Sequence, residues 1–254
     1  MTELRFIAVA HEIIEKIGTT QKDNLRNAAD LYARCIAQDG LVHLWGGGHS
    51  AMGVQETFPR IGSIIGFHPI AELPLTYYTN VVGTCGLRQS FFLERLSGYA
   101  EAILLNYEFG PQDCFEVISS TGINNVAIEM ALGAKQRGMP VVAITSVGHQ
   151  STTASRHPSG KKLADIAEIV IDNCTPPGDA SIHVRGCDYP TSATSSVAVI
   201  TIVQTLNALV AEKLVELGHK PLILGSPHFV AKAEESERNL QAYYAEFRRR
   251  TRRL

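Results

Sequence analysis

The chain has 254 residues, 45% hydrophobic and 19% charged, and a formal net charge of -2 at pH 7. This composition is typical of a globular protein with a sizeable core, and the small net charge favours neither nucleic acid nor an anionic membrane as a partner. The start of the chain lacks a signal-peptide layout, and no apolar run approaches the roughly 20 residues of a membrane span. The five cysteines, Cys85 among them, form no C-x-x-C pair. We therefore expect a cytoplasmic protein with reduced thiols.

The first half of the chain predicts helices and short strands in alternation. Residues 3–39 predict two helices with a break at "GTTQ". An apolar strand at 41–45 leads into a helix at 49–60, and a short strand follows at 63–67. The stretch 87–107 is predicted to be mostly helical.

The second half continues this alternation. Its predicted elements are strands at 113–120, 140–146 and 167–173, helices at 124–137, 193–217 and 230–250, and an edge strand at 220–225. Short apolar strands between helices predict an α/β fold, a three-layer α/β/α sandwich around a parallel sheet. Ligands of such folds bind at the carboxyl ends of the strands.

Three turns at predicted strand ends are rich in glycine and hydroxyl side chains. They are "WGGGHS" at 45–50, "ISSTGINN" at 118–125 and "ITSVGHQSTTASRHPSGKK" at 144–162. The first two lead directly into a helix, whose first backbone N–H groups and positive dipole end attract anions. Such turns are suited to binding a phosphate group without a lysine.

The kind of phosphate ligand can be narrowed by motif. G-x-x-x-x-G-K-[ST], the motif of triphosphate sites, is absent. Gly46, Gly48 and Ala51 match the dinucleotide pattern G-x-G-x-x-A, but Glu72 does not clearly end a strand where a ribose-binding acid is needed. The hydroxyl groups of "ISSTG" favour a single phosphate instead.

"ISSTGINN" resembles the I-S-x-S-G-x-[ST] loop of the sugar isomerase (SIS) domain family, and "GGGHSAMGVQE" resembles its first phosphate turn. Further similar blocks, such as "LERLSGYAEAIL" and "PTSATSS", extend the resemblance over residues 41–210. The resemblance implies a five-stranded parallel sheet, a sugar phosphate ligand and a homodimer or homotetramer. We expect one SIS domain over 1–254, with leading helices at 1–40, an α/β core at 41–225 and a helical tail at 226–254.

The candidate binding residues come from the first two of these turns and from the third turn, at 144–162. Ser50, Ser119, Thr121 and Asn124 are the principal side-chain candidates, although serines at these positions also cap helices. The full predicted phosphate and substrate site comprises Gly48, Ser50, Ser119, Ser120, Thr121, Gly122, Asn124, Ser146 and His149.

The predicted reaction is aldose–ketose isomerisation, in which a carboxylate moves a proton between neighbouring carbons. Glu56, two turns beyond His49, is the candidate base, and Glu101 in "GYAE" resembles the acid of SIS-domain etherases. His49 and His157 are the candidate proton donors. An etherase-like lyase acting on an amino-sugar phosphate and a non-catalytic phosphosugar sensor remain alternatives. We expect no cofactor, and no sequence motif indicates a metal site.

Overall fold

Five parallel strands form the central sheet of the computed structural model, which describes residues 4–76, 86–227 and 233–254. The strand order is β2-β1-β3-β4-β5. The strands are β1 (Val42–Gly46), β2 (Phe67–Ile70), β3 (Cys114–Ile118), β4 (Val141–Thr145) and β5 (Ile169–Asp172). The predicted α/β fold with a five-stranded parallel sheet is confirmed.

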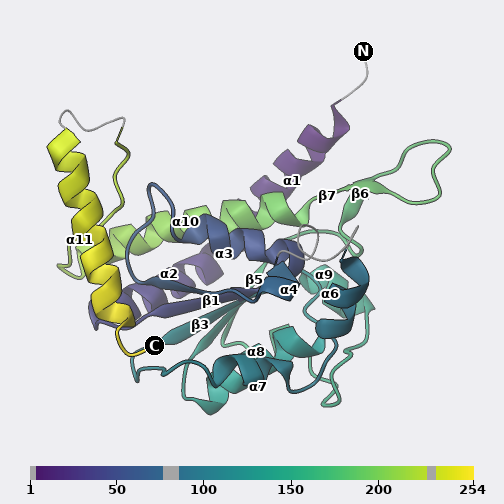
Figure 1. Cartoon of the computed structure of the whole chain (residues 1–254). Helices are drawn as coiled ribbons and strands as arrows, with labels where there is room; N and C mark the ends of the chain where they lie inside the picture. The colour runs from purple at the N-terminus through teal and green to yellow at the C-terminus, as the bar shows by residue number, and fades with distance from the viewer. Residues whose placement is uncertain (1–3, 77–85, 228–232) are drawn as a thin grey trace.

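Helices cover both faces of this sheet (Figure 1). One face carries α1 (Arg5–Thr20), α2 (Lys22–Ala37), α3 (Ala51–Thr57) and α10 (Ser195–Glu216). The other face carries α7 (Tyr99–Leu104) and α8 (Asn125–Gln136), and α11 (Ala233–Thr251) packs at one edge. The remaining short helices are α4 (Leu73–Thr76), α6 (Leu87–Leu93) and α9 (Val147–Thr152), with 3-10 turns at Gly48–Ser50 and Leu163–Asp165.

Every residue of β1, β3 and β4 is buried, as expected for strands covered on both faces. Successive side chains point to opposite faces. Val42 and Leu44 pack with α2 and α10, whereas Phe115 and Val117 pack with α7 and α8. Gly46 pairs with Ile118, so the turns that follow β1 and β3 open at the same edge of the sheet.

Helix α10 is long and apolar enough to cross a membrane by length and composition alone. The apolar residues of α10 are explained by its packing against α2 and α3. The side chains of Ile202, Val203 and Leu206 are buried there. This helix is therefore part of the core.

The amino end of the sheet contains a buried ionic network. His43 Nε2 lies 3.0 Å from Asp113 Oδ2, and His43 Nδ1 lies 3.0 Å from His68 Nδ1. Burial lowers the pKa of His68 to about 3, so this ring is neutral. Arg253, beyond α11, donates to both oxygens of Asp113 at 2.5 and 2.7 Å. His43 is thus a hydrogen-bonded core residue that helps hold the end of the chain.

Several element boundaries differ from the predictions. Strand β2 begins at Phe67, because Gly66 turns the chain with φ +121° and residues 62–65 pair with 222–224 instead. The predicted edge strand at 220–225 therefore contributes an isolated bridge between Ile64 and Ile223 and does not join the main sheet. The stretch 87–107, predicted to be mostly helical, contains two helices, and Gly98 with φ +83° lies between them.

An antiparallel pair, β6 (Ala180–Ile182) and β7 (Thr191–Ala193), was not predicted. Four cysteines, Cys35, Cys114, Cys174 and Cys187, are free thiols, whereas Cys85 lies outside the described residues.

Candidate functional site

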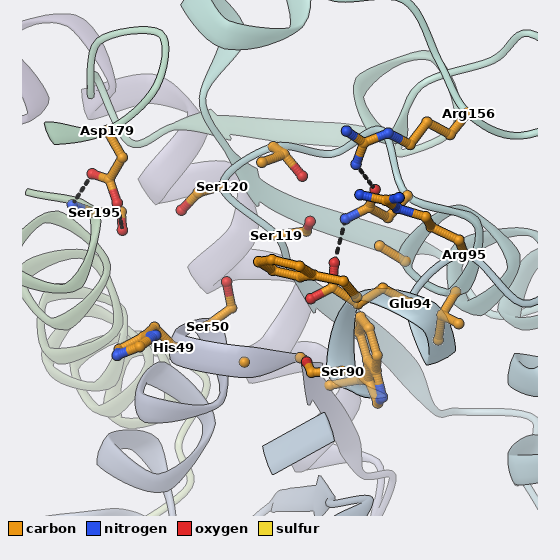
Figure 2. Close-up of a pocket in the computed structure, with 18 of the residues that line it drawn as sticks. His49, Ser50, Ser90, Glu94, Arg95, Ser119, Ser120, Arg156, Asp179 and Ser195 are labelled. Carbon is orange, nitrogen blue, oxygen red and sulfur yellow. Dashed lines mark hydrogen bonds between the residues drawn. The ribbon is translucent and has the colours of Figure 1, made fainter. Parts of the chain in front are cut away.

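A cavity of about 490 Å³ lies at the carboxyl ends of β1 and β3 (Figure 2). Cavities of this size hold small-molecule ligands. Its walls come from the turns after β1 and β3, from α6 and its continuation, and from the residues around the start of α10. The lining includes the side chains labelled in Figure 2, namely His49, Ser50, Ser90, Glu94, Arg95, Ser119, Ser120, Arg156, Asp179 and Ser195.

The turn between β3 and α8 forms a cup of hydroxyl groups, Ser119, Ser120 and Thr121. Gly122 has φ +60°, and a Cβ at this position would collide with the side chain of Gln150. The Gly122 N–H donates to Ser119 Oγ at 3.2 Å, so the turn is held in shape without a ligand. The cup stands at the start of α8, where a helix favours an anion.

The turn after β1 faces the same cavity. Gly48 has φ +58° and begins the 3-10 turn that leads into α3. A Cβ at Gly46 would lie 2.7 Å from the carbonyl oxygen of Ser50, so only glycine allows the chain to bend back this closely. Ser50 and His49 consequently reach the cavity wall.

Glu94 is a carboxylate in the cavity that the sequence analysis did not single out. Its Oε2 accepts a hydrogen bond of 2.5 Å from Asn124 Nδ2, and Asn124 Oδ1 accepts one of 2.6 Å from Arg156. Because arginine only donates, the amide oxygen must face Arg156 and the amide nitrogen must face Glu94. Burial raises the pKa of Glu94 above its ordinary value, and the positive charges of Arg95 and Arg156 oppose that shift.

Asp179 lies on the side of the cavity opposite Glu94 (Figure 2). Its carboxylate accepts hydrogen bonds from the backbone of Thr194 and Ser195 and from Ser195 Oγ, at 2.6–2.9 Å. The Asp179 carboxylate therefore caps the start of α10, and its negative charge interacts with the positive end of that helix.

Seven of the predicted site residues line the cavity together: Gly48, His49, Ser50, Ser119, Ser120, Thr121 and Asn124. Gly122 is not in the lining, and its N–H donates to Ser119 Oγ of the cup. Ser146 caps α9 by accepting a hydrogen bond from the N–H of His149. The His149 ring accepts a hydrogen bond from the Gly178 N–H, and burial lowers the pKa of this ring. Neither Ser146 nor His149 is among the residues that line the cavity.

The predicted catalytic carboxylates lie outside the cavity lining. Glu56 accepts from Gln204 at 2.8 Å and pairs with Arg60 at 3.1 Å. Glu101 is exposed on α7 and pairs with Arg137 at 2.7 Å. Their roles in proton transfer stay predictions.

His157 also lies outside the lining. Its Nε2 is 3.7 Å from Glu129 Oε1, and its Nδ1 is 2.7 Å from Ser159 Oγ. Glu129 also accepts from the N–H of Gly98 at 2.9 Å. The role of His157 as a proton donor stays a prediction.

The family model of the SIS domain matches residues 5–146, which is more than half of the chain. The chain belongs to the SIS-domain family. Within it, this SIS-domain protein is 34% identical over 236 residues to a UPF0309 protein of Geobacillus kaustophilus, covering 92% of this chain and 90% of the relative. It is 38% identical over 184 residues to a UPF0309 protein of Thermoanaerobacter pseudethanolicus, covering 72% of each chain. It is thus a member of the UPF0309 family.

The fold of this SIS-domain protein is also similar to solved structures. A phosphoheptose isomerase from Francisella tularensis superimposes with a TM-score of 0.50 at 16% identity, covering 82% of this chain and 95% of that chain. At this identity the similarity concerns the fold alone. Within the described residues, no group of three or more His, Cys, Asp or Glu side chains is arranged to hold a metal ion.

Proposed function

We propose that this protein binds a sugar phosphate in the cavity at the carboxyl ends of β1 and β3 and isomerises it between aldose and ketose forms. The observation that carries the proposal is the hydroxyl cup of Ser119, Ser120 and Thr121 at the start of α8, with the Glu94 carboxylate in the same cavity. Membership of the SIS-domain family supports a sugar phosphate as the ligand.

The phosphate would bind in the hydroxyl cup and against the start of α8, with Ser50 contributing from the neighbouring turn. Hydroxyl and backbone N–H donors suit a dianion, and the helix dipole adds a favourable field. The hydrogen bond from the Gly122 N–H to Ser119 Oγ holds the cup in shape, so little ordering is needed when the ligand binds. This arrangement supports phosphate binding without a lysine.

Glu94 would transfer the proton in the chemical step. Isomerisation removes a proton from the carbon beside a carbonyl and returns it to the neighbouring carbon, which requires a base within hydrogen-bond reach of the sugar. A raised pKa brings a carboxylate closer to the pKa of an efficient general base. Asn124 holds one oxygen of Glu94, which fixes the orientation of the carboxylate toward the ligand.

A thermal-shift screen against a panel of sugar phosphates tests the binding step, because a ligand raises the unfolding midpoint by mass action. Thr121→Val keeps the shape of the side chain and removes one hydroxyl donor to the phosphate. We expect it to weaken binding by about tenfold or more. A variant with unchanged affinity for every ligand of the panel would remove the cup from the site. Binding without turnover would favour a sensor, and cleavage of an ether-linked sugar phosphate would favour a lyase.

We also propose that the protein forms a homodimer or homotetramer. Leu4 and Ile7, at the start of α1, are 74% and 62% exposed, and this end of α1 projects from the body of the protein (Figure 1). Exposed apolar residues on a projecting helix support a contact between subunits. Light scattering at micromolar concentration tests this, and a monomer would contradict it.

A further inference from the structure

Arginine side chains gather at one side of the candidate cavity. Arg95 and Arg156 both line it, and Figure 2 shows both on the same side of the cavity as Glu94. They come from different parts of the chain, Arg95 from just beyond α6 and Arg156 from the loop after α9. Neither residue belongs to the hydroxyl cup.

Both arginines are anchored to the start of α8. The backbone N–H of Arg156 donates to Ile123 O at 2.9 Å, and its Nη1 donates to Asn124 Oδ1 at 2.6 Å. The carbonyl oxygen of Arg95 accepts from Asn125 Nδ2 at 2.8 Å. The guanidinium groups therefore extend from fixed backbone positions at the rim of the cavity.

The charges on this side of the cavity do not balance. Among the described residues, neither Arg95 nor Arg156 forms a salt bridge. Glu94 and Asp179 are the two carboxylates that line the cavity in the described part of the chain, and Asp179 is committed to the start of α10. The described part of the cavity lining thus holds two guanidinium groups and, besides Asp179, one carboxylate, which leaves an excess positive charge on this side.

A guanidinium group has five N–H donors, and Asn124 takes one of those of Arg156. The remaining donors match the paired oxygens of a carboxylate or a phosphate. The hydroxyl cup already offers the donors that one phosphate group needs, and a cavity of about 490 Å³ holds more than that group.

We propose that the substrate carries a second anionic group besides its phosphate, and that Arg95 and Arg156 bind this group and determine specificity. The inference rests on the proposed sugar phosphate site. The ligand class is a sugar phosphate that carries a carboxylate or a second phosphate besides the phosphate bound in the cup.

Calorimetry with two matched ligands tests the inference. 6-Phosphogluconate and sorbitol 6-phosphate share a phosphate and a six-carbon chain, and they differ by a carboxylate in place of a hydroxymethyl group. We expect the native protein to bind 6-phosphogluconate at least about tenfold more tightly, the effect of one added charge-assisted contact. Fructose 1,6-bisphosphate against fructose 6-phosphate shows whether a phosphate serves better than a carboxylate as the second group.

Removing the charges of the two arginines tests whether they cause the preference for 6-phosphogluconate over sorbitol 6-phosphate. In the double variant Arg95→Gln with Arg156→Gln, the preference should fall to below about threefold. Lys161→Gln is the matched control, because Lys161 is exposed on the same loop as Arg156 and does not line the cavity.

The outcomes separate this inference from the proposed function. Equal binding of the matched ligands by the native protein, or a preference that persists in the folded double variant, would overturn the inference and leave sugar phosphate binding intact. If no sugar phosphate binds at all, the proposed function and the inference both fail. Circular dichroism of each variant establishes that it is folded.

Discussion

Asp113 and Glu94 lie at opposite ends of the same parallel sheet, and their surroundings differ. Asp113, at the amino end, is 2% exposed and accepts hydrogen bonds from His43, Arg253 and the backbone of Leu41 and Gly110. Glu94, at the carboxyl end, lines a cavity, and within the described residues its carboxylate accepts one hydrogen bond, from Asn124. A fully satisfied buried charge holds a structure together, whereas a partly satisfied charge beside a cavity is available to a ligand.

The largest effect is expected at the cavity. Glu94→Gln keeps the size of the side chain and removes its basicity, so turnover of a sugar phosphate should fall by roughly two to four powers of ten. Ligand affinity should change little, because the hydroxyl cup provides the phosphate contacts. Steady-state kinetics and calorimetry measure the two quantities. A variant that loses binding and turnover together would make Glu94 a structural residue like Asp113.

At the amino end we expect an effect on stability instead. Asp113→Asn leaves Arg253 and His43 beside an uncharged amide, and breaking a buried ion pair costs about 3–5 kcal/mol. Urea denaturation measures the change. The matched control is Asp39→Asn, because Asp39 pairs with Arg249 on the surface, where a salt bridge contributes less than about 1 kcal/mol. Equal effects in the two variants would contradict the structural role of Asp113.

The pH dependence of stability should distinguish Asp113 from Glu116, a carboxyl group buried in the middle of β3. Burial raises the pKa of Glu116 to about 7, although the hydrogen bond from Tyr32 lowers it in part. Between about pH 4.5 and 7 the unfolded chain releases this proton and the folded protein keeps it. Stability should therefore fall as pH rises, by up to about 1.4 kcal/mol per pH unit from this group.

Glu116→Gln is neutral at every pH and should lose that slope, which denaturation at about pH 5, 6 and 7 would show. The contribution of Asp113 to stability changes with pH in the opposite direction. Burial alone would raise its pKa, but the hydrogen bonds from His43 and Arg253 lower it to about 2. Its contribution is present above its unfolded pKa of about 3.9 and is lost as the pH falls toward 2. If Glu116→Gln keeps the wild-type slope of stability against pH, the slope does not come from Glu116.

The smallest effect is expected for Glu101→Gln. Glu101 is exposed and its salt bridge with Arg137 lies outside the cavity lining, so stability should change by less than about 1 kcal/mol. Turnover should stay within about twofold of the native protein. A loss comparable to that of Glu94→Gln would restore Glu101 as a catalytic acid and favour the lyase.

The sheet and the hydroxyl cup were predictable because both depend on local patterns. Apolar strands such as β3 alternate with helices along the chain, and "ISSTG" puts its hydroxyl groups directly at a strand end. Glu94 was not predictable in the same way. It lies 30 residues before Asn124, just after α6, and only the tertiary contact of this segment with the start of α8 brings the two together.

Periodicity also could not place Glu56, the one charged side chain of α3. Two helical turns separate Glu56 from His49, which indicates one face but not the neighbour of that face. The structure turns Glu56 toward Gln204 of α10 and toward Arg60.

Deuterium exchange from heavy water at the carbon beside the carbonyl of a bound sugar phosphate tests the central claim most directly, because it isolates proton abstraction from the later steps. NMR of the native protein with its tightest-binding aldose or ketose phosphate should show this exchange. We expect Glu94→Gln to abolish it with affinity retained, and Glu56→Gln to exchange at close to the native rate. Exchange at the native rate in Glu94→Gln, with loss in Glu56→Gln, would contradict the account and make Glu56 the base.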